Sequence, residues 1–74
     1  MAQSSCQTFT ARVLQVMEDA LLVRNCQTGQ EILAHTGCAG CFSVGDCVCV
    51  RFNGVMTMSI PPQITARCIR KINC

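Results

Sequence analysis

Four cysteines and one histidine lie within fifteen residues, in the stretch HTGCAGCFSVGDCVC that begins at His35 and ends at Cys49. Thiolate and imidazole groups are the ligands that structural zinc sites use. The same thiols could instead form disulfides, or could fill apolar space without any chemistry. The stretch therefore raises three alternatives, and the elements that position its residues decide among them.

A zinc site is built most easily here from His35, Cys38, Cys41 and one of Cys47 or Cys49, of which we take Cys47. Structural zinc sites usually draw on two cysteine pairs separated by a dozen or more residues, whereas five residues separate Cys41 from Cys47. Cys47 and Cys49 do not pair well on one metal, because alternate residues of a strand lie about 6.8 Å apart. Two sulfurs on one zinc lie only about 3.8 Å apart. We therefore expect no resident cofactor, with zinc at these four residues as the alternative.

The chain holds eight cysteines among 74 residues, a composition typical of a secreted disulfide scaffold. The N-terminal residues MAQSSCQTFT, however, lack the basic start and apolar segment of a signal peptide. We therefore expect a cytoplasmic protein with mostly reduced thiols that act as apolar fillers, Cys26 and Cys68 among them. Disulfide or redox roles are the alternative. No apolar run reaches the length of a membrane span, so no membrane partner is expected.

Catalysis finds little support among these residues. His35 and Cys38 could serve as base and nucleophile, but no third residue or oxyanion loop accompanies them. Glu18 and Asp19 are neighbours in a turn, so their carboxylates point apart, and the sequence has no glycine-rich phosphate loop. We predict that the protein is not an enzyme.

Short strands separated by turn signals must position these side chains. β-Branched and apolar residues predict strands over 9–17, 20–25, 30–35, 47–52, 55–58 and 64–72. The segment 36–45 contains three glycines and is predicted to be a loop with one short helical turn.

In the fourth predicted strand, 47–52, large apolar residues occupy every second position, which is the clearest such pattern in the sequence. It places Val48, Val50 and Phe52 on one face, which we expect to be the inner one. Asn53-Gly54 follows and predicts a tight hairpin into the return strand. Pro61-Pro62 then interrupts the sheet before the last strand.

Five or six short strands must protect their edges, and closing into a small barrel does so. Three strands, a longer loop and two further strands suit the OB-fold, a five-stranded Greek-key barrel, with an SH3-like barrel as the alternative. We therefore predict an all-β protein with one barrel domain over residues 9–74. A disordered N-terminus is predicted over residues 1–8.

Three segments carry resemblances to known protein families. DALLVRNCQTGQEILAH, from Asp19 to His35, resembles the second and third strands of bacterial translation initiation factor one and related S1-type domains. VGDCVCV is similar to their Gly-Asp-x-Val-x-Val strand, and MTMSIPPQITA at 56–66 resembles a segment of small uncharacterised bacterial proteins. These resemblances imply a bacterial OB-fold protein. The Ser-Gly-Lys-x-Arg loop of the initiation factors is replaced here by Thr-Gly-Cys-Ala-Gly-Cys, which lacks the basic residues of a ribosomal contact.

Single-stranded nucleic acid is the default ligand of an OB barrel, bound through the face of strands two and three and the neighbouring loops. Such binding requires stacking aromatics and a basic groove. The sequence has no Trp or Tyr, but residues 47–74 carry four cations and no acid. We predict a sparse nucleic-acid-binding face composed of Phe9, Arg12, Arg24, Phe42 and Arg51. The alternative for the two phenylalanines is that they cap the ends of the barrel.

The segment MTMSIPPQ at 56–63 offers a second surface. A rigid turn at Pro61-Pro62 would suit a protein partner. The competing interpretation is that Met56 and Met58 plug the barrel. The sequence thus predicts a small binding module for single-stranded nucleic acid, with a protein-interaction or structural module carrying a cysteine-rich metal site as the alternative.

Overall fold

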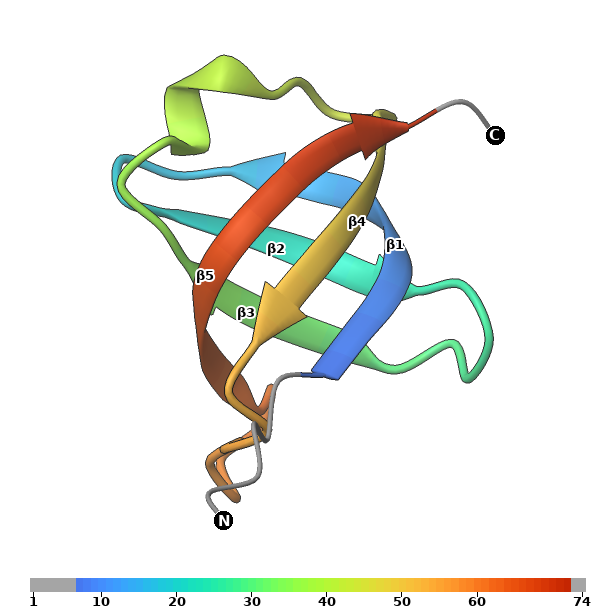
Figure 1. Ribbon diagram of the computed structural model, residues 1–74, viewed down its shortest axis with the longest axis vertical. Helices are drawn as coiled ribbons and strands as arrows, with labels where there is room; N and C mark the ends of the chain where they lie inside the picture. The colour runs from blue at the N-terminus through green and yellow to red at the C-terminus, as the bar shows by residue number, and fades with distance from the viewer. Residues whose placement is uncertain (1–6, 73–74) are drawn as a thin grey trace, which may run out of the picture.

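The computed structural model describes residues 7–72, which form five β-strands and one short 3₁₀ helix (Figure 1). The elements are β1 (Gln7–Val16), β2 (Ala20–Asn25), β3 (Glu31–His35), η1 (Ala39–Cys41), β4 (Cys47–Phe52) and β5 (Gln63–Ile72). The predicted all-β class is confirmed, since this part of the chain contains no α-helix. None of its helical segments is long and apolar enough to cross a membrane.

The N-terminal boundary differs from the prediction. The disordered segment predicted over 1–8 falls mostly outside the described residues, but Gln7 and Thr8 already belong to β1. Both pair with β4, opposite Phe52 and Arg51 respectively. The barrel therefore begins at least two residues before the predicted start of the domain.

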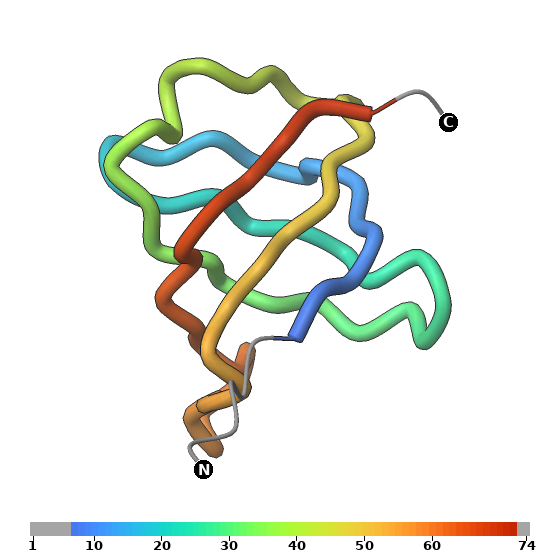
Figure 2. Tube along the Cα trace, in the orientation of Figure 1, coloured from blue at the N-terminus to red at the C-terminus, as the bar shows by residue number. Residues whose placement is uncertain are grey.

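The five strands form one sheet that closes in the order β1-β2-β3-β5-β4. Neighbouring strands are antiparallel except β3 and β5, which run parallel where Leu33 to His35 face Gln63 to Thr65. β1 pairs with β4 through its first half and with β2 through its second. A register shift between Val13 and Gln15 bends β1 between these two neighbours, and its trace curves accordingly in Figure 2.

The inward side chains of the strands form a single apolar core. Its largest fully buried members are Leu21, Ile32, Val13, Val23, Val48 and Val50. The prediction that Val48, Val50 and Phe52 point inward is confirmed, because their exposed fractions are 0%, 0% and 4%. Burying a side chain of this kind contributes about 1.5–3 kcal/mol, so this alternation is what drives closure.

The predicted return strand over 55–58 is wrong, because residues 53–62 form a loop between β4 and β5. β4 already pairs with β1 along one edge and with β5 along the other, so a return strand has no edge to join. The tight turn also fails locally, since a type I′ turn needs positive φ at both central residues and Asn53 does not have it. Asn53 Oδ1 instead accepts a hydrogen bond of 3.0 Å from the Val55 N–H.

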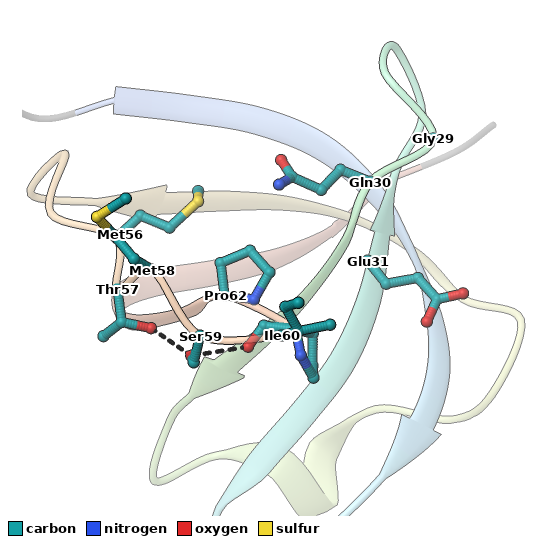
Figure 3. A pocket seen from close by; sticks show the side chains of 10 residues that line it. Gly29, Gln30, Glu31, Met56, Thr57, Met58, Ser59, Ile60 and Pro62 are labelled. Atoms are coloured by element: carbon teal, nitrogen blue, oxygen red, sulfur yellow. Dashed lines mark hydrogen bonds between the residues drawn. The ribbon is translucent and has the colours of Figure 1, made fainter.

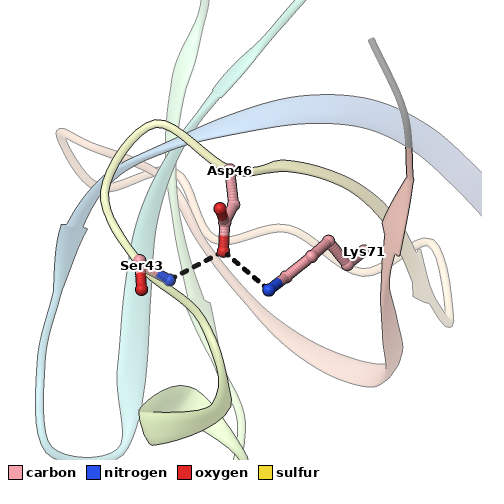
Figure 4. Close-up of polar contacts among 3 residues, drawn as sticks. All are labelled: Ser43, Asp46 and Lys71. Carbon is pink, nitrogen blue, oxygen red and sulfur yellow. Dashed lines mark hydrogen bonds and ion pairs between the residues drawn. The ribbon is translucent and has the colours of Figure 1, made fainter.

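The connection from β3 to β4 contains the predicted short helical turn, η1. Its end is attached to β1: the Gly45 N–H donates to the Val13 carbonyl at 2.8 Å, and the Val13 N–H donates to the Asp46 carbonyl at 2.9 Å. The Asp46 carboxylate also accepts from the Ser43 N–H and faces Lys71 of β5 (Figure 4). These contacts set where β4 begins.

Candidate functional site

The outward side chains of β1, β4 and β5 form a regular grid, which we call the β1–β4–β5 face. Each row contains one residue from each strand, and successive rows are about 7 Å apart. In the order β1, β4, β5, the rows are Arg12, Cys47 and Ile72; Thr10, Cys49 and Arg70; and Thr8, Arg51 and Cys68. The three strands lie side by side toward the viewer in Figure 1.

Positive charge concentrates on this face. Arg12, Arg51 and Arg70 are exposed, and the grid contains no acidic residue. Among the described residues, neither Arg51 nor Arg70 has an ion-pair partner. Arg24 of β2 lies directly opposite Arg12, with Glu31 of β3 on its other side. The register therefore gathers four arginines that are far apart in the sequence.

A pocket of about 180 Å³ lies within this face. It is lined by Thr8, Cys49, Arg51, Cys68 and Arg70. The two guanidinium groups offer forked donors that match carboxylate and phosphate oxygens, and the hydroxyl can add one more hydrogen bond. The chemistry of this lining suits a small anion or one anionic group of a larger ligand.

The five residues predicted to bind nucleic acid fall into two sets. Arg12, Arg24 and Arg51 lie on the outer surface, the first two as cross-strand neighbours. Phe9 and Phe42 are half-buried and pack against the core. The Phe9 ring also meets that of Phe52 edge to face, with centroids 5.7 Å apart. The two phenylalanines thus pack against the core, whereas the three arginines lie on the outer surface.

Sequence reasoning missed Arg70, Cys49 and Cys68 as members of the site. Alternation within 64–72 suggests that Arg70 and Cys68 share one face of their strand. Only the register of β5 against β4 shows that this face lies beside Arg51.

The outer face of β2 and β3 is less basic. Its one arginine, Arg24, lies opposite Glu31, which offsets its charge. Two residues along the strands from this pair, the half-exposed Leu22 of β2 lies opposite Leu33 of β3, so this part of the face is apolar. The outer face of β2 and β3, which an OB barrel uses by default, therefore carries less net positive charge than the β1–β4–β5 face.

The four predicted zinc ligands are not assembled into a site. Within residues 7–72, no three His, Cys, Asp or Glu side chains are grouped closely enough to hold a metal ion. His35 Nε2 lies 2.9 Å from Gln63 Oε1, while Cys38 and Cys41 are exposed thiols beside and within η1. Cys47 is buried and disulfide-bonded, and a disulfide sulfur does not serve as a thiolate ligand.

The prediction that Cys26 and Cys68 are apolar fillers is wrong. Both are exposed free thiols, as are Cys38 and Cys41, and Cys49 is half-buried. Cys26 follows β2 in the turn to β3, and Cys68 points outward because it pairs with the exposed Arg51. These thiols are available to reagents in solution, which a filler is not.

A larger and more open pocket, of about 620 Å³, lies between the β2–β3 turn and the β4–β5 loop (Figure 3). Thr57 closes the base of this loop, since its N–H donates to the Gln63 carbonyl and its Oγ1 accepts from the Gln63 N–H. Met56 packs against the core, as the plug interpretation expects. Met58 and Ile60, by contrast, are 100% and 98% exposed, so the loop presents an apolar tip.

No protein family model, curated protein or solved structure matches this chain.

Proposed function

We propose that the protein is an OB-fold module that binds the phosphate backbone of single-stranded nucleic acid through the β1–β4–β5 face. The strand order supports the fold assignment. In a Greek key the fourth strand returns to lie beside the first, which gives the order β4-β1-β2-β3 found here. β5 then completes a five-stranded barrel between β3 and β4, the architecture of an OB-fold.

The observation that carries the proposal is the pair Arg51 and Arg70, which come from neighbouring strands, line one pocket and have no ion-pair partner among the described residues. Arg12 of β1 lies on the same face and adds a third positive charge. Guanidinium forks bind phosphate oxygens, and each phosphate that is neutralised releases counterions into solution. Because Phe9 and Phe42 pack against the core, the face offers no exposed ring on which a base can stack. We therefore expect binding that depends strongly on salt and little on base sequence.

Oligonucleotide binding measured by fluorescence anisotropy at several salt concentrations tests this function. The double variant R51Q/R70Q keeps side-chain length but removes two positive charges. It should weaken binding of a single-stranded oligonucleotide and reduce the slope of log affinity against log salt by about 1.4, or 0.7 for each lost phosphate contact. The apolar-tip variant M58S/I60S is the matched control and should retain both values. Absence of binding by the unaltered chain at low salt would overturn the proposal, as would unchanged binding in R51Q/R70Q.

A protein-interaction module is the second candidate function, and the apolar tip of the β4–β5 loop favours it. Met58 and Ile60 are almost completely exposed, and such side chains commonly mark contact surfaces. Sedimentation velocity over a range of protein concentrations tests the simplest form, a contact with a second copy of the chain. If the chain self-associates and the variant M58S/I60S does not, this function is supported. If the chain is a monomer at every concentration, contact with a second copy is contradicted.

A further inference from the structure

The pocket on the β1–β4–β5 face brings two free thiols together with two guanidinium groups. Cys68 lies directly opposite Arg51, and Cys49 lies directly opposite Arg70. Opposed side chains in an antiparallel pair have Cβ atoms about 4.5–5.5 Å apart, so each thiol has an arginine as its cross-strand neighbour. All four residues line the same pocket. Cys68 is exposed and Cys49 is half-buried, which makes Cys68 the more accessible sulfur.

We propose that Cys68 is a modification site for a negatively charged disulfide of the glutathione type, and that Arg51 and Arg70 recognise the negative charge of this reagent. Glutathione disulfide has carboxylates at its ends, and a guanidinium fork can bind a carboxylate through two parallel hydrogen bonds. A positively charged pocket raises the local concentration of such an anion beside the thiol. The proposal uses the pocket alone and does not depend on the binding of nucleic acid.

The reaction is a thiol–disulfide exchange. The Cys68 thiolate attacks one sulfur of the disulfide, a new S–S bond forms between Cys68 and that sulfur, and the original S–S bond breaks. The second half of the reagent leaves as a thiolate and takes up the proton that Cys68 lost. The Cys68 sulfur is oxidised and the leaving thiol is reduced, so the anionic disulfide is the only oxidant needed.

Two other exposed thiols of the chain serve as internal controls for the reactivity of Cys68. Cys38 and Cys41 are also exposed free thiols, but the segment 36–45 that carries them has no lysine or arginine. If exposure alone governed the reaction, these two thiols and Cys68 would show the same preference between reagents of opposite charge. Recognition by Arg51 and Arg70 predicts a preference at Cys68 that Cys38 and Cys41 lack.

The experiment measures modification rates of the full chain with glutathione disulfide, which is anionic, and with cystamine, which is a cationic disulfide. Peptide mapping by mass spectrometry gives the rate at each cysteine. The ratio of the anionic to the cationic rate should be about tenfold higher at Cys68 than at Cys38 and Cys41. High salt should reduce this difference, because screening weakens exposed charges.

The variant R51Q/R70Q isolates the cause of the preference. It should lower the rate ratio at Cys68 to the value at Cys38 and Cys41, and should leave the ratio at those two cysteines unchanged. Circular dichroism confirms that the variant is folded. A wild-type ratio at Cys68 equal to that of Cys38 and Cys41 would overturn the proposal, and so would a ratio that R51Q/R70Q does not alter. No nucleic acid is present in the measurement, so its outcome is separate from that of the oligonucleotide assay.

Discussion

At the scale of single residues, Asp46 joins the β3–β4 loop to the last strand. Its Oδ2 accepts a hydrogen bond of 2.9 Å from the Ser43 N–H and lies 3.4 Å from Lys71 Nζ (Figure 4). The two contacts differ in environment, because the Asp46 side chain is 23% exposed and the Lys71 side chain is 59% exposed. Exposed ion pairs contribute little to stability, whereas a carboxylate that accepts a backbone N–H in a turn contributes more.

Substituting Asp46 and substituting Lys71 should therefore lower the free energy of unfolding by different amounts. D46A is expected to lower the free energy of unfolding by about 1–2 kcal/mol, since it removes the hydrogen bond and the ion pair together. K71Q removes only the ion pair and should cost less than about 1 kcal/mol. Urea denaturation, with the slope of the transition held as a check on two-state unfolding, measures both values. A larger loss in K71Q than in D46A would contradict this ranking.

At the scale of elements, the junction between the β3–β4 loop and β4 depends on one glycine. Gly45 has a φ of 93°, a left-handed conformation that side chains other than glycine rarely adopt. A Cβ built there meets no atom within 4 Å, so strain of the backbone and not a steric clash is what excludes other residues. Gly40, within η1, is equally open but has no positive φ.

The two glycines form a matched pair for testing this junction. G45A should lower the free energy of unfolding by about 1–2 kcal/mol, because alanine must adopt a left-handed conformation. G40A should be neutral or should stabilise by up to about 1 kcal/mol, because alanine restricts the unfolded chain without straining the folded one. Thermal and urea denaturation compare them. Equal effects of the two substitutions would show that the conformation of Gly45 is not the cause.

Five of the six predicted strands are confirmed within residues 7–72, because the sequence signal for each of them is local. The alternation of apolar residues within 47–52, for example, specifies both the strand and its inner face. The return strand over 55–58 could not be excluded in this way, since only the pairing of β4 with both β1 and β5 removes its partner. Which residues lie on the β1–β4–β5 face depends in the same way on how the strands pair. The register of β5 against β4 shifts between Arg51 and Phe52, and this shift determines which β4 residues lie opposite Cys68 and Arg70.

At the scale of the whole molecule, a small number of inward side chains maintains the barrel. Leu21 is fully buried within the core, whereas its neighbour Leu22 is half-exposed on the outer surface opposite Leu33. A domain of this size is stable by only a few kcal/mol, so a single cavity can remove much of that stability.

Substituting these two leucines tests which side of β2 faces the core. L21A should lower the free energy of unfolding by about 2–5 kcal/mol, enough to leave much of the protein unfolded. L22A removes the same atoms from a half-exposed position and should cost clearly less. Circular dichroism and urea titration of both variants measure the difference. A comparable loss in L22A would mean that the inner and outer faces of β2 have been assigned the wrong way round.

The bend of β1 between β4 and β2 also has a consequence for folding during synthesis. A ribosome makes β1, β2 and β3 first, and these can pair as a three-stranded meander. Residues Gln7 to Thr10 of β1 pair with no strand other than β4, so they have no strand neighbour until residues 47–52 have emerged from the exit tunnel. The nascent chain therefore keeps one strand edge exposed through the synthesis of the cysteine-rich segment. Closure follows only when β5 emerges and fills the gap between β3 and β4.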